Sequence, residues 1–171
     1  MHTIKKIRIN NIIAKLKFLV LSFSALLVIF SISSLSFANN HNQLKTLNGK
    51  ELIDAKQNGA IIIDIRRSEE WLDTGIIEGA KLITAFQKDG NIHPEFKNKF
   101  NSIIISDEMP IVLYCRTGNR TNVLGNALIN QLGFKNISHL SNGIEGWRKN
   151  GFNTIDYHDK MKVLGRNQST P

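Results

Sequence analysis

Two short apolar runs constrain the fold of this chain more than any other feature of its sequence. Residues 61–65 read Ile-Ile-Ile-Asp-Ile, and residues 111–114 read Ile-Val-Leu-Tyr. Runs that are almost continuously apolar and rich in β-branched residues are typical of strands covered on both faces, which occur mainly in parallel sheets. The sequence therefore predicts an α/β domain built around a parallel sheet.

Helical patterns separate these strands, as the βα order of such a domain requires. Asn48 and Glu51 have the spacing of a capping box at the start of one helix. Gly133 is placed to end another. The other expected elements are a polar lead-in over residues 39–47, a helical turn capped by Ser68, a short strand over 80–83, a helix that begins at Pro94, a helix over 123–132, a strand over 136–140 and a helix over 143–149.

The first 38 residues have the pattern of a signal peptide. Basic residues precede an apolar stretch over residues 18–30, and Ser36-Phe37-Ala38 provides the small-x-small pattern of a signal peptidase site. We predict cleavage after Ala38, a periplasmic or otherwise exported domain over residues 39–155 and a polar tail over residues 156–171. The alternative is an uncleaved anchor in the inner membrane, which would be the chain's contact with a membrane. Both interpretations place the domain outside the cytoplasm, because the basic flank stays inside.

Composition argues against several classes of function. The net charge is +8, but five of the 22 Lys and Arg residues lie within residues 1–38, which contain no acid. The other 17 face 14 Asp and Glu residues, so the predicted domain is only mildly basic and a nucleic-acid partner is not expected. The single Cys and five scattered His residues show no metal-ligand spacing. No nucleotide fingerprint is present, so we expect neither a metal nor a cofactor.

The most informative segment is Tyr-Cys-Arg-Thr-Gly-Asn-Arg-Thr, residues 114–121. Cys115 directly follows a predicted strand, at the sheet edge where ligands of open α/β sheets bind. The loop N–H groups, the start of the next helix and two Arg side chains all favour an anion and a nucleophilic thiolate. The alternative, a buried structural Cys, fits poorly with a loop of this composition. We therefore predict Cys115 as the nucleophile and, as residues that bind the substrate, Arg116, Thr117, Gly118, Asn119 and Arg120.

Three segments of the chain resemble sequence blocks of the rhodanese family and occur in the same order. Asp64-Ile65-Arg66, with Glu70-Trp71, Gly75 and Gly79-Ala80, resembles the family's first block. Residues 115–120 fit its six-residue C-R-x-G-x-R loop, and residues 143–147 fit the block near the end of its domain. The resemblance covers about residues 44–152. It implies a doubly wound α/β fold with a central parallel sheet flanked by helices. It also implies transfer of sulfane sulfur, from a donor such as thiosulfate to a thiophilic acceptor, through a persulfide on Cys115.

The resemblance also assigns roles outside the loop. Asp64 and Arg66 match residues that support the loop and its cleft, although a structural ion pair explains them equally well. Trp71 and Trp147 are interpreted as packing residues. The chain departs from the family pattern at two positions: Ile76 stands where His is common, and Asn142 replaces a Gly. Asn tolerates the left-handed conformation better than most residues, so we expect the turn that contains Asn142 to form despite the replacement.

Two other classes of function compete with sulfur transfer. Cysteine phosphatases and arsenate reductases use a longer Cys-x5-Arg loop, whereas here Arg120 follows Cys115 after four residues and Thr121 holds the later position. A binding or redox-partner module of the same fold is the other alternative, although the Cys and both loop Arg residues are present. The expected partners are a small anionic sulfur donor and a thiol or protein acceptor. The sequence leaves open whether the donor is thiosulfate, a polysulfide or a persulfide.

Overall fold

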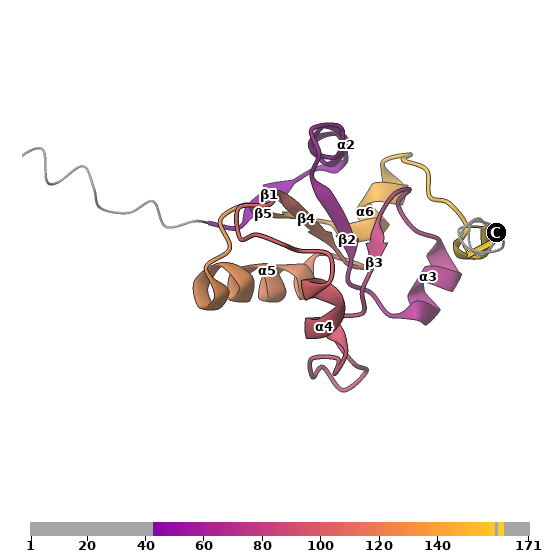
Figure 1. The fold of residues 1–171 in the computed structure, drawn as a ribbon. Coiled ribbons are helices and arrows are strands. Elements are labelled where there is room, and N and C mark those ends of the chain that lie inside the picture. The colour runs from indigo at the N-terminus through magenta and orange to yellow at the C-terminus, as the bar shows by residue number, and fades with distance from the viewer. Residues whose placement is uncertain (1–42, 160, 163–171) are drawn as a thin grey trace, which may run out of the picture. The chain divides into compact units, whose positions relative to one another are not determined.

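The computed structural model describes residues 43–159 and 161–162 (Figure 1). The predicted signal peptide, residues 1–38, lies outside the described residues, as does most of the predicted tail. Within the described residues, no helix is long and apolar enough to cross a membrane.

A single five-stranded sheet forms the centre of the described residues, with strand order β1-β5-β4-β2-β3. Every neighbouring pair in this sheet is parallel. The central strand is β4, which connects directly to Cys115. The strands are β1 (Lys45–Leu47), β2 (Ile61–Asp64), β3 (Lys81–Leu82), β4 (Ile111–Tyr114) and β5 (Ile137–Leu140).

Helices cover both faces of the sheet, which confirms the predicted α/β class (Figure 1). The helices α4 and α5 pack on one face, and α2 and α6 pack on the other. The helix α3 follows β2 at the side of the sheet where β3 is the last strand. The helices are α2 (Gly49–Gln57), α3 (Ser68–Thr74), α4 (Phe96–Asn101), α5 (Asn119–Leu132) and α6 (Gly143–Lys149).

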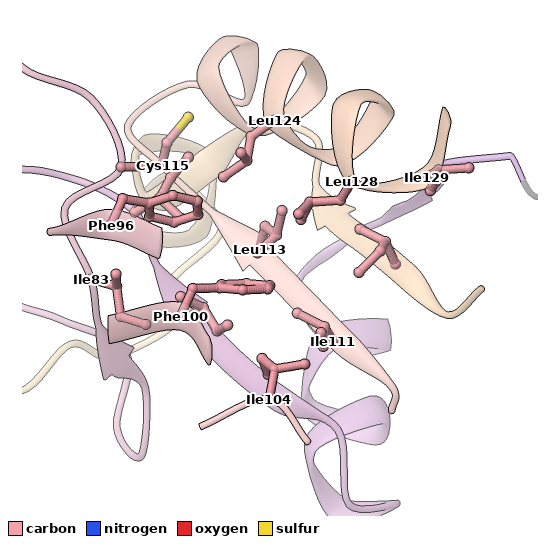
Figure 2. Packing of buried hydrophobic residues seen from close by; sticks show 14 residues of the cluster. Ile83, Phe96, Phe100, Ile104, Ile111, Leu113, Cys115, Leu124, Leu128 and Ile129 are labelled. Carbon is pink, nitrogen blue, oxygen red and sulfur yellow. The ribbon is translucent and has the colours of Figure 1, made fainter. Parts of the chain in front are cut away.

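Alternate residues of the central strands divide the core into two clusters. On the α4 and α5 face, Ile111 and Leu113 of β4 pack with aromatic residues of α4 and with Leu124 and Leu128 of α5 (Figure 2). On the opposite face, Val112 belongs to the cluster that includes residues of α2 and α6. Both faces of β4 are buried in the core, which explains why its sequence is a continuous run of four buried residues.

Local signals explain several helix ends. The Asn48 side chain accepts hydrogen bonds from the N–H groups of Lys50 and Glu51, and Glu51 accepts one from the Asn48 N–H, so the predicted capping box is confirmed. Gly133 ends α5 with a φ of 75°, a left-handed conformation that favours glycine.

The structure corrects three expectations about local structure. Residues 45–47, expected as part of a polar lead-in, form the edge strand β1 and pair with β5. Ser68 is the first residue of α3 and does not cap it; instead, the Glu70 carboxylate accepts the N–H of Arg67. The helix α4 begins at Phe96, after Pro94, and ends at Asn101.

A pair of Leu substitutions tests the packing of β4. Leu113 is fully buried, whereas Leu72 on α3 is 49% exposed. Leu113→Ala is expected to lower the free energy of unfolding by about 2–5 kcal/mol, because it removes buried methyl groups and leaves a cavity. Leu72→Ala is the control and should change stability little. Denaturant titration measures both, and equal effects of the two substitutions would contradict the packing described here.

Candidate active site

The predicted nucleophile lies at the junction between β4 and α5. Cys115 follows β4 directly and is 1% exposed. Figure 2 shows its side chain at the end of the core cluster, beside the first turn of α5. Its Sγ accepts a hydrogen bond from the Gly118 N–H at 3.2 Å. The sulfur is therefore held at the N-terminus of α5, where N–H groups without helical partners favour negative charge.

Close backbone packing fixes the shape of the loop that follows Cys115. The N–H of Ile144 donates to the Cys115 carbonyl at 2.9 Å, and the N–H of Glu145 donates to the Arg116 carbonyl at 3.1 Å. The first turn of α6 therefore satisfies two carbonyl groups of the loop.

Two glycines allow this contact between the loop and its neighbours. Gly118 has a φ of 97°, and a Cβ there would lie 1.8 Å from the Ser141 carbonyl oxygen. A Cβ at Gly143 would lie 2.3 Å from the Arg116 carbonyl oxygen. Gly143 has the left-handed conformation, with a φ of 55°, whereas Asn142 has a φ of −100°. The expectation that Asn142 needs left-handed tolerance is therefore wrong, because the demand falls on the glycine that the sequence retains.

Arg120 is engaged by a carboxylate from another element. Its guanidinium donates two hydrogen bonds to Glu70 of α3, at 2.6 and 2.8 Å. The hydrogen bond and charge of Glu70 raise the pKa of Arg120, and Cys115 adds a smaller contribution in the same direction. Burial raises the pKa of Glu70, but the bonds from Arg120 and from the Arg67 N–H outweigh it, so this pKa lies below its ordinary value of 4.5. The pair is bidentate and ties the loop to α3.

Three of the other predicted loop residues line one pocket with Arg120, whereas Gly118 and the buried Cys115 are not among its lining residues. This pocket has a volume of about 450 Å³. Arg116 is exposed there, and its Nε lies 3.4 Å from Glu145. Exposed pairs of this kind contribute little free energy. The pocket is lined by Arg116, Thr117, Asn119 and Arg120 from the loop and first turn of α5, and by residues that include Arg66 and Glu70 on the opposite side.

Asp64 and Arg66 form a fully buried ion pair beside this pocket. Arg66 Nη2 lies 2.7 Å from Asp64 Oδ2, and both side chains are 0% exposed. Burial lowers the pKa of Arg66, but the hydrogen bond and charge of Asp64 outweigh it, so the pKa is raised. Arg66 also donates to the carbonyl of Glu70 and to the hydroxyl of Thr74. These contacts hold the helix that carries Glu70, which fits the supporting role that the sequence suggested.

Trp71, Trp147 and Ile76, which the sequence also singled out, occupy packing positions. Trp71 and Trp147 are buried, and their rings pack against Tyr157 and Phe152. Ile76 is fully buried and forms an isolated antiparallel bridge with Ile155. Among the described residues, no group of three or more His, Cys, Asp and Glu residues could hold a metal ion.

Sequence reasoning missed three residues near the loop. Glu70 was recognised as part of a motif, but nothing indicated that it would bind Arg120, fifty residues later. Thr121 Oγ1 lies 3.9 Å from Cys115 Sγ, and it forms a hydrogen bond with His139 Nδ1. The position of Thr121 directly after the loop was a weak signal, whereas His139 lies within a strand and gave none.

The chain matches the model of a known family and is similar in sequence to curated proteins. The family model described as "Rhodanese-like domain" matches residues 48–150. An uncharacterised protein of Rickettsia prowazekii, RP600, is 30% identical over 100 residues, which are 54% of this chain and 80% of that protein. An uncharacterised protein of Rickettsia conorii, RC0915, is 28% identical over 99 residues, which are 53% of this chain and 79% of that protein.

Two solved structures share the fold. The polysulfide-sulfur transferase homodimer from Wolinella succinogenes matches with a TM-score of 0.53 and 21% identity, over 66% of this chain and 79% of that one. Rv0390 from M. tuberculosis matches with a TM-score of 0.51 and 18% identity, over 63% of this chain and 94% of that one. At these identities the likeness is one of fold.

The pairing of Arg120 with Glu70 leads to a pH-dependent stability. Glu70→Gln should lower the free energy of unfolding by about 1–3 kcal/mol at pH 7, between the values for exposed and buried pairs. The folded-state pKa of Glu70 is depressed, so its contribution is present above the unfolded value of 4.5 and is lost as pH falls through the folded value. The difference between wild type and Glu70→Gln should therefore vanish in acid.

Denaturant titrations at several pH values measure this difference. The control is Glu69→Gln, which removes an exposed carboxylate that pairs with Arg67, and should change stability little at any pH. A difference between wild type and Glu70→Gln that persisted unchanged at pH 3 would contradict the ion-pair explanation.

Proposed function

The chain belongs to the rhodanese-like domain family, and we propose that it is a sulfurtransferase that carries sulfane sulfur as a persulfide on Cys115. Family membership supports a sulfur-transfer type of function in general. The observation that carries the specific proposal is the position of the sulfur. Cys115 Sγ accepts the Gly118 N–H at 3.2 Å, at the start of α5 and inside a six-residue loop. A thiolate and a persulfide are both anionic, so the same donors stabilise both states.

In the charging step, the Cys115 thiolate attacks the outer sulfur of an anionic donor such as thiosulfate. A bond forms between Sγ and this sulfur, and the sulfur–sulfur bond of thiosulfate breaks. Its electron pair leaves with sulfite. Cys115 is left as a persulfide, and the step needs no external oxidant or reductant.

In the discharge step, a thiophilic acceptor attacks the terminal sulfur of the persulfide. A bond forms between the acceptor and this sulfur, and the bond to Cys115 Sγ breaks. The electron pair returns to Sγ as a thiolate, which restores the starting protein. Cyanide gives thiocyanate in this step, and a thiolate acceptor gives a new persulfide.

The two loop arginines support the chemistry in different ways. Arg120 is paired with Glu70, so its charge is largely balanced and its part in the proposal is to hold the loop and the first turn of α5. The Arg116 side chain forms an exposed contact with Glu145. An anionic donor can replace this weak contact, and we assign Arg116 to the approach of the donor. Thr117 and Asn119 line the same pocket and are assigned to the walls of the donor site.

The proposed chemistry limits the chemical class of the donor and of the acceptor. A small anion with a terminal sulfane sulfur suits the pocket, and thiosulfate and polysulfide are the two donors to compare. If residues 1–38 direct export, the natural acceptor is a thiol outside the cytoplasm, carried by a small molecule or by another exported protein.

Intact-mass measurement tests this proposal directly. The full chain is incubated with thiosulfate, the donor is removed, and the mass is recorded without reductant. The expected result is a gain of one sulfur atom, which cyanide then removes as thiocyanate. Cys115→Ser should show no gain, because the chain has no other Cys.

The donor is varied within the same experiment. Charging by polysulfide alone would keep the sulfurtransferase function and change its donor. A folded protein with a free thiol that no sulfane donor charges would show that the proposal is wrong and favour a binding or redox-partner role.

A further inference from the structure

A chain of polar side chains, none of which lines the donor pocket, links Cys115 to the edge strand β1. Cys115 Sγ lies 3.9 Å from Thr121 Oγ1, and Thr121 Oγ1 lies 3.1 Å from His139 Nδ1. On the other side of the ring, His139 Nε2 lies 3.3 Å from Thr46 Oγ1 on the edge strand β1. Thr121 is 0% exposed and His139 is 5% exposed. The charging and discharge steps described above assign no role to either residue.

The Thr121 hydroxyl has more acceptors around it than it has hydrogens. In this structure the hydroxyl donates to the Gly118 carbonyl oxygen at 2.8 Å, and its oxygen also lies near the sulfur and the imidazole. A hydroxyl carries one hydrogen and can accept through its lone pairs. Whether Thr121 donates to Cys115 therefore depends on which neighbouring groups donate and which accept.

The position of the hydrogen on the His139 ring determines which neighbours of Thr121 donate to it and which accept from it. Burial lowers the pKa of His139, and a hydrogen bond to the Gly118 carbonyl only partly opposes this, so the neutral form of the ring is favoured. A neutral imidazole carries a single hydrogen. If that hydrogen is on Nδ1, it faces the Gly118 carbonyl and the Thr121 oxygen, and Nε2 is free to accept the Thr46 hydroxyl.

We propose that His139 is a positioning residue for sulfur transfer, which directs the Thr121 hydroxyl toward Cys115 Sγ. With a hydrogen on Nδ1, His139 cannot accept from Thr121 and instead faces the Thr121 oxygen and the Gly118 carbonyl as a donor. The Thr121 hydrogen, which the Gly118 carbonyl accepts in this structure, can then turn to the sulfur when negative charge develops there. Cys115 thereby gains a side-chain donor in addition to the Gly118 N–H. This inference rests on the proposed sulfurtransferase function.

The two half-reactions should depend on this donor to different extents. In discharge, negative charge develops on Sγ as the persulfide bond breaks, so a hydroxyl donor stabilises the leaving thiolate. In charging, the thiolate is the reactant and loses its charge, so removal of the donor does not slow its attack. The Thr121 hydrogen stays on its oxygen throughout, and no further electron or proton transfer is required.

Single-turnover kinetics separates the two half-reactions. Both are measured in the same buffer at one fixed pH, so that the two rates of each variant can be compared directly. Sulfite release from thiosulfate reports charging, and thiocyanate formation from the charged, donor-free protein reports discharge. Thr121→Val and His139→Leu should each slow discharge about tenfold, as expected for loss of a hydrogen bond to a charged group. Charging should stay close to the wild-type rate.

Conservative variants distinguish positioning from packing. Thr121→Ser retains the hydroxyl, and His139→Asn can place an amide nitrogen near the position of Nδ1, so both should restore most of the discharge rate. His93→Gln is the matched control, since His93 lines a different pocket, and it should behave as wild type. If Thr121→Val does not fold, the comparison of His139→Leu with His139→Asn still carries the test.

Three results would overturn the proposal. They are wild-type discharge in Thr121→Val and His139→Leu, equal slowing of both half-reactions, and discharge in His139→Asn as slow as in His139→Leu. A wild-type protein that no sulfane donor charges would instead count against the sulfurtransferase function itself. The two failures are therefore distinguishable.

Discussion

The arrangement of the loop formed by residues 115–120 depends on the buried ion pair between Asp64 and Arg66. Burying a charge without partners is unfavourable by several kcal/mol, and such a pair is tolerated only when its hydrogen bonds are complete. Arg66 meets this condition: Nε and Nη2 donate to Asp64, and the remaining donors reach the carbonyls of Glu70 and Gly75 and the Thr74 hydroxyl. The end of β2 is thereby joined to both ends of α3. This is what places Glu70 opposite Arg120.

The loop is held from three directions. The strand β4 delivers Cys115, α3 binds Arg120 through Glu70, and the start of α6 donates to the carbonyls of Cys115 and Arg116. Glu70 balances much of the charge of Arg120, so we propose that the Gly118 N–H and the start of α5 supply most of the stabilisation of an anion on the sulfur, with a smaller part from Arg120. The sequence suggested that both arginines supply charge to the anion. We propose a division of tasks, in which Arg120 mainly organises the loop through Glu70 and Arg116 meets the donor.

Much of the fold was predictable because its signals are local. Continuous apolar runs located β2 and β4, the Asn48 capping box located α2, and a lone Cys after β4 located the loop. The edge strand β1 was missed because it has three residues, of which only Leu47 is buried, and because it forms by pairing with the distant strand β5. The contacts of Arg120 with Glu70 and of Thr121 with His139 join segments distant in sequence. No local pattern encodes such pairs, since they arise only when the sheet brings the segments together.

The central claim is that the persulfide proposed for Cys115 lies among the backbone N–H groups of residues 116–120, of which the Gly118 N–H donates to Sγ. Amide NMR spectra of ¹⁵N-labelled protein, recorded before and after charging with a sulfane donor, test it most directly. If these groups hold the sulfur, their signals should move more than those of other residues, and Cys115→Ser should show no such change. Changes centred on the separate pocket of about 710 Å³ near Trp71 and Tyr157, with the loop signals unmoved, would contradict it.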